Sequence, residues 1–107
     1  MNKVILIGRL TADPELRKTS NDKSVASFSL AINRGQDEVD FINVVAWETQ
    51  ADNVKKYLVK GSQVAIDGRI QTRNYDDKDG NKKYVTEVVA NNIEFVGNKV
   101  TKEESAE

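Results

Sequence analysis

Alternation of apolar and polar residues along three stretches is what most constrains the fold of this chain. The stretches run from Val25 to Asn33, from Asp40 to Glu48 and from Ser62 to Tyr75. Successive side chains of a β-strand point to opposite faces of a sheet, so a period of two indicates strands with one face on a core. Apolar stretches from Lys3 to Leu10 and from Lys82 to Val96 also suit strands. The sequence therefore predicts a mainly β protein.

One short helix is expected among these strands, over about Gln50 to Val59. Its apolar residues recur at helical spacing, and Lys60-Gly61 is a helix stop signal. Thr49 is the expected N-cap, with Asp52 in place of the usual Glu of a capping box. Three strands, a helix and two strands form the pattern of an OB-fold. We therefore predict an all-β protein, a five-stranded antiparallel Greek-key barrel with one α-helix between the third and fourth strands.

The length of 107 residues suits one domain. We expect the barrel to occupy residues 1–97 and a short, polar, disordered tail to occupy residues 98–107. No apolar run approaches the length of a membrane span, and the apolar stretch from Val4 to Ile7 is too short for a signal peptide. These features favour a cytoplasmic protein.

The composition argues against catalysis and metal binding. The chain has no cysteine and no histidine, which removes disulfides, thiolate ligands and the usual general base. Asp76, Asp77 and Asp79 fit a hairpin turn around Asp79-Gly80 better than a calcium loop, because no bidentate Glu follows at the required spacing. We expect no enzyme activity, no catalytic residue, no metal and no cofactor.

The net charge gives no general affinity for nucleic acid. It is -1 for the whole chain, and residues 1–99 hold 15 basic and 14 acidic residues. Any surface for nucleic acid must therefore come from the local arrangement of charge.

Two large aromatic residues stand on the face of the strand from Asp40 to Glu48 that is not the expected core. Phe41 and Trp47 share this face with Asn43 and Val45, and about 20 Å of strand separates the two rings. Spaced flat rings can stack unpaired bases, because every base has a π-face. They can equally belong to a second buried surface, such as a subunit interface, and both interpretations stay open.

Cations and a third ring project together from the next strand. Arg69, Arg73 and Tyr75 lie at alternate positions, so they share a face. Guanidinium groups can bind phosphates and stack on bases, although a solvated strand face with cross-strand ion pairs is the alternative. Lys3 and Arg34, on or beside strands, are further candidates for phosphate contacts. Lys60, at the end of the helix, is explained by the helix dipole.

Several blocks of sequence, in order, resemble the bacterial-type single-stranded DNA-binding proteins (SSB). They are Asn-Lys-Val-Ile-Leu-Ile-Gly-Arg-Leu at 2–10, Asp-Pro-Glu-Leu-Arg at 13–17, Tyr-Leu-Val-Lys-Gly-Ser-Gln-Val at 57–64, Gly-Arg-Ile-Gln-Thr-Arg-Asn-Tyr at 68–75 and Thr-Glu-Val-Val at 86–89. The likeness extends from Asn2 to about Val96.

This resemblance implies an OB-fold that binds and protects single-stranded DNA in replication, recombination or repair, at the nucleoid. It implies stacking rings at Phe41, Trp47 and Tyr75, and phosphate contacts at Arg73, Lys3 and Lys60. It also implies a homotetramer, with the first strand, Lys3 to Gly8, at a dimer contact.

The chain departs from the family pattern at two places. The connection from Arg34 to Asp40 is short and lacks the aromatic residue often found there, which predicts one stacking position fewer. The C-terminal sequence Glu-Glu-Ser-Ala-Glu lacks the acidic tip that ends in apolar residues, so recruitment of replication proteins is not expected. An alternative function is an OB-fold interaction module of a primosome-like assembly with weak affinity for DNA.

Overall fold

The computed structural model describes residues 1–96 and contains six strands and one helix. In chain order these are β1 (Val4–Leu10), β2 (Glu15–Lys18), β3 (Ser24–Gly35), β4 (Glu38–Trp47), α1 (Thr49–Tyr57), β5 (Gln63–Asp76) and β6 (Lys82–Phe95). The expected tail at 98–107 lies outside the described residues. No helix within residues 1–96 is long and apolar enough to cross a membrane.

Five of the strands close into a barrel, which confirms the predicted OB-fold. The sheet order is β1-β5-β6-β4-β3-β2, and an additional pairing of β1 with β3 closes the ring. The short strand β2 is attached to β3 outside this ring. The pairing of β4 with β6 is parallel, whereas the other pairs in the barrel are antiparallel. The expectation of a wholly antiparallel barrel was therefore wrong at this one seam.

Alternate residues of the strands fill the core as the sequence predicts. Ala26, Phe28 and Leu30 of β3 are buried there, together with Val44 and Ala46 of β4. The helix α1 adds Ala51 and Val54 to the same cluster, and Leu58, directly after the helix, belongs to it as well. This packing explains why the apolar residues between β4 and β5 recur at helical spacing.

The start of α1 differs from the predicted capping box. The N-cap residue is Glu48, at φ 51°, and no side chain caps the helix. Thr49 is already the first helical residue, because the chain turns sharply at Glu48 directly after Trp47 ends β4. The helix also ends earlier than expected, at Tyr57, and Leu58 is extended.

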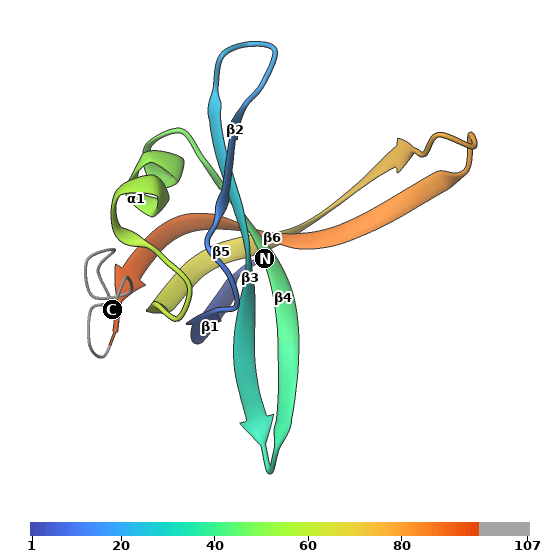
Figure 1. Ribbon diagram of the computed structural model, residues 1–107. Coiled ribbons are helices and arrows are strands. Elements are labelled where there is room, and N and C mark those ends of the chain that lie inside the picture. The colour runs from blue at the N-terminus through green and yellow to red at the C-terminus, as the bar shows by residue number, and fades with distance from the viewer. Residues whose placement is uncertain (97–107) are drawn as a thin grey trace.

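Hairpins project from the barrel in different directions (Figure 1). The β5–β6 hairpin, which we call the β5–β6 arm (residues 69–89), extends far beyond the barrel. At its root Asp67 pairs with Asn92 but Gly68 pairs with Ala90, so Asn91 is an extra residue in β6. A bulge of this kind bends its strand, and here it lies where the arm leaves the barrel.

The β3–β4 hairpin is longer than the sequence predicts. Arg34 and Glu38 belong to the strands rather than to the connection, so only residues 36 and 37 remain as the turn. Gly35 and Asp37 both have positive φ, which allows this tight connection.

Candidate nucleic-acid interface

A groove of about 920 Å³ lies between the outer face of β3 and β4 and the β5–β6 arm. Residues with outward positions on the paired strands line it from both sides: Ser27, Ser29, Asn43 and Val45 on one, and Arg73, Tyr75, Val85 and Glu87 on the other. The segment before β2 and β2 itself form a further wall, with Thr11, Ala12 and Asp13 from the segment and Glu15 and Arg17 from the strand. Strand segments far apart in the sequence thus share one outer surface.

The three predicted rings are exposed and surround this surface. Phe41 and Trp47 of β4 are 66% and 38% exposed, and Tyr75 of β5 is 49% exposed. Phe41 and Trp47 stand on either side of the groove residues Asn43 and Val45, on the same face of β4. Tyr75 lines the groove from the arm. In the chain as described, none of the rings is enclosed by protein, so each can meet a flat partner.

Val45 shows that part of the outer face is nevertheless covered. It is only 7% exposed, and it pairs with Val89, which is 6% exposed, at the parallel seam between β4 and β6. Neither residue belongs to the barrel core cluster. Within this single chain, therefore, the outer face is covered at these two valines, between the rings, whereas the rings themselves are exposed.

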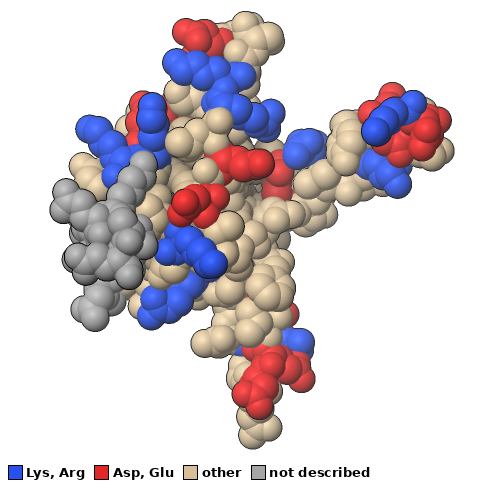
Figure 2. Space-filling view, viewed as in Figure 1, with Lys and Arg blue, Asp and Glu red and all other residues tan. Residues whose placement is uncertain are grey.

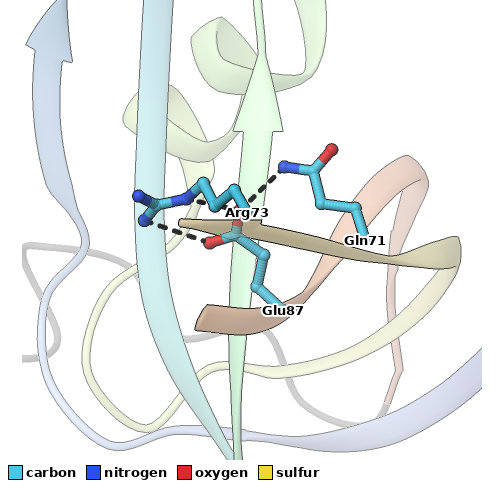
Figure 3. Close-up of polar contacts among 3 residues, drawn as sticks. All are labelled: Gln71, Arg73 and Glu87. Carbon is cyan, nitrogen blue, oxygen red and sulfur yellow. Dashed lines mark hydrogen bonds and ion pairs between the residues drawn. The ribbon is translucent and has the colours of Figure 1, made fainter. Parts of the chain in front are cut away.

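Arg73 is held by a buried carboxylate across the hairpin (Figure 3). Its Nε atom lies 3.0 Å from Oε2 of Glu87, and its Nη2 atom lies 3.5 Å from Oε1. Gln71 donates from Nε2 to the same Oε2 atom at 2.7 Å. Glu87 is 4% exposed, whereas the Arg73 side chain is 49% exposed. The guanidinium group therefore faces the groove with one edge already bonded to protein.

Two other predicted cations also have acidic partners. Lys3 Nζ lies 2.9 Å from Oδ1 of Asp67. Arg34 bridges the β3–β4 hairpin, with Nη2 2.6 Å from Glu38 and Nε 3.1 Å from Asp40. All these side chains are about half exposed, so water weakens the pairs and each cation can exchange partners at small cost. These contacts place Lys3 and Arg34 outside the groove, on the barrel and on the β3–β4 hairpin.

Arg69 and Lys60 form no ion pair with any residue between 1 and 96. Arg69 pairs in register with Val89, which in turn pairs with Val45, so it lies two strands from the centre of β4. The backbone N–H of Lys60 donates to Oδ1 of Asp13, a groove residue, at 2.8 Å. Both cations are exposed and near the groove, although neither lines it.

On the face shown in Figure 2, charge does not separate into basic and acidic areas. Figure 2 shows Lys and Arg side chains mixed with Asp and Glu side chains at the tips of the projecting hairpins. At the end of the arm, for example, Asp77 lies 3.9 Å from Lys83. This mixing agrees with the near-neutral composition, and it leaves the exposed rings as the most specific feature of the surface.

Sequence reasoning missed Glu87 and Arg17 as groove residues, and it missed Gln71 as a hydrogen-bond partner of Glu87. Glu87 is a single charge between Val85, Val88 and Val89, and such an isolated charge in an apolar strand was the available signal. Its partners could not be found in advance, because the pairing of Gln71 with Glu87 depends on the register of the arm.

The fold and the groove together define a class of protein. A closed barrel of this topology, with exposed rings and guanidinium groups along one outer surface, is an OB-fold built to contact an extended polymer with flat groups, such as an unpaired nucleic-acid strand.

Comparison with known proteins agrees with this class. Residues 1–96 match the model of the single-strand binding protein family, so the chain belongs to that family. It is 54% identical to single-stranded DNA-binding protein 1 of Staphylococcus aureus (strain MSSA476), over 94% of this chain and 69% of that protein. It is 54% identical to single-stranded DNA-binding protein 2 of strain Mu50, over 90% of this chain and 72% of that protein. With the single-stranded DNA-binding protein of Bacillus cereus the identity is 55%, over 90% of this chain and 60% of that protein.

Proposed function

We propose that this chain binds single-stranded DNA with little sequence preference and protects it, and that it acts as a binding protein rather than an enzyme. Membership of the single-strand binding protein family supports this function. The observation that carries it is the exposure of Phe41, Trp47 and Tyr75 around one groove.

Two kinds of contact contribute to binding: the rings stack on bases, and the cations contact phosphates. Each ring accepts one base at a contribution of about 1–3 kcal/mol, whatever the base, since stacking needs only a π-face. Arg69 and Lys60, which have no acidic partner within residues 1–96, are the cations best placed to meet phosphates beside the groove. Lys3 and Arg34 extend this path if they exchange their carboxylates for phosphates.

The decisive experiment is a titration of tryptophan fluorescence with poly-deoxythymidine at several salt concentrations. Trp47 is the single tryptophan of the chain, so the signal reports one position on the proposed surface. We expect strong quenching and an affinity that falls as salt rises. If fluorescence does not change and no complex forms, the DNA-binding function is refuted. Capture of a replication protein without DNA would then favour the interaction module. Competition with RNA oligomers tests the preference for DNA.

A second copy of the chain is the proposed cover for the outer face of β1. Ile5 and Ile7 are 67% and 54% exposed there, next to each other on one side of the strand. Such a pair is costly to leave in water, and burial of both side chains contributes about 1–3 kcal/mol each. We place the protein as a homotetramer in the cytoplasm, at the nucleoid, during replication, recombination or repair.

A further inference from the structure

The groove is not positively charged, which is unexpected for a surface that receives a polyanion. Its lining holds two guanidinium groups, Arg17 and Arg73, but three carboxylates, Asp13, Glu15 and Glu87. Asp13 and Glu15 are exposed, whereas Glu87 is 4% exposed. Glu87 is therefore the carboxylate that cannot move away or be screened by water when a strand enters.

The buried position of Glu87 demands an explanation beyond packing. Its outward neighbours along β6 are Val85 and Val89, which show that an aliphatic side chain suits this face of the strand. A buried carboxylate loses its hydration and is retained at low cost only when its oxygens are paired. The pairing is present here, since Oε2 accepts from Gln71 at 2.7 Å and from Arg73 Nε at 3.0 Å.

The pairing fixes the plane of the Arg73 guanidinium. Two of its nitrogens, Nε and Nη2, face the two oxygens of Glu87 at 3.0 and 3.5 Å, and such a two-point contact restricts the orientation of a guanidinium group. The two strands that carry the pair are neighbours, with Gln71 directly opposite Glu87. Figure 3 shows the amide and the guanidinium converging on the carboxylate from β5. The remaining Nη1 edge and the flat face stay available to the groove.

We propose that Glu87 is a positioning residue of the DNA interface: it orients Arg73 across the groove and cancels its charge. The pair then meets the strand as a neutral group that stacks on or donates to a base, and it does not act as a counter-charge for phosphate. Phosphates follow the cations that have no acidic partner within residues 1–96, such as Arg17 in the groove and Arg69 and Lys60 beside it. This inference rests on the proposed binding of single-stranded DNA and specifies how one part of that surface works.

Replacement of Glu87 by glutamine tests the inference, because Glu87→Gln keeps the shape and an acceptor oxygen for Arg73 but removes the charge. The guanidinium charge is then uncompensated. For a single strand each added charge steepens the slope of log affinity against log salt by about 0.7. We expect this change for Glu87→Gln, with about two- to tenfold tighter binding at 50 mM salt. The double variant Arg73→Gln/Glu87→Gln should return to the wild-type slope and bind more weakly than wild type.

Two controls separate the possible outcomes. Asp52→Asn removes one negative charge from α1, which does not line the groove, and should leave the slope unchanged. Circular dichroism during heating shows that each variant is folded before its affinity is measured. A wild-type slope in folded Glu87→Gln, whatever its affinity, overturns the inference and leaves the DNA-binding function intact. Failure of the wild-type protein itself to bind would instead refute the proposed function.

Discussion

Replacement of Phe41 by alanine is the sharpest test of base stacking, because the ring is more exposed than the other two. Phe41 lies on the outer face of β4 opposite Ala31 of β3, and 66% of its surface is open to solvent. Only about one third of the residue is covered, or roughly 70 Å² of an aromatic side chain of about 200 Å². At about 25 cal/mol per Å² this coverage contributes at most about 1–2 kcal/mol to the free energy of unfolding.

The cost to binding should be larger than the cost to stability. Loss of one stacked base reduces affinity by about 1–3 kcal/mol, which is about 5- to 150-fold. We expect Phe41→Ala to remain folded and to need a correspondingly higher concentration of deoxythymidine oligomer to quench Trp47. Isothermal titration calorimetry provides an independent value for the same affinity.

Matched variants show whether the π-face is responsible. Phe41→Leu keeps an apolar side chain of similar length but has no ring, so it should lose most of the affinity that the stacked base contributes. Val39→Ala removes an aliphatic side chain from the same face of β4 and should change binding little. Wild-type affinity in a folded Phe41→Ala protein would show that no base stacks at this position and would refute the reasoning.

Three further changes test other parts of the structure. Arg69→Ala should reduce the salt slope of binding by about 0.7, because Arg69 has no acidic partner within residues 1–96; an unchanged slope would rule out a phosphate contact there. Gly68→Ala should lower the free energy of unfolding by about 2–4 kcal/mol in a urea titration, since its Cβ would lie 2.1 Å from the carbonyl oxygen of Val89 at the root of the arm; wild-type stability would contradict this close approach. Ile7→Asp should reduce the mass of the assembly in analytical ultracentrifugation, and an unchanged mass would exclude β1 from the subunit contact.

Local pattern was sufficient to predict the barrel and the rings. The period of two predicted that β3 and β4 each have one face on a core and that Phe41 and Trp47 lie on the other face of β4, as the structure has them. This works because the face on which a side chain lies depends only on its position along its own strand. The resemblance to the family, which the family match confirms, supplied the expected function.

Features that depend on contacts between distant segments could not be predicted. The pairing of Arg73 with Glu87 requires the register of the β5–β6 arm, and the bulge at Asn91 shifts that register at the root. The groove forms because the β3–β4 hairpin and the β5–β6 arm extend in different directions from the paired strands β4 and β6. No single stretch of sequence determines this arrangement. The prediction of Thr49 as the N-cap of α1 was wrong for a related reason. The chain turns sharply at Glu48, and the position of that turn depends on where β4 ends.

The parallel pairing of β4 with β6 is part of the closed barrel and also lies under the groove. Val44 pairs with Val88 and Val45 with Val89, and no other pair of residues is in register along these two strands within residues 1–96. The same two β4 valines line the groove. A polymer bound above this short contact would touch strands on both sides of it, and because it binds only the folded protein it should raise the free energy of unfolding.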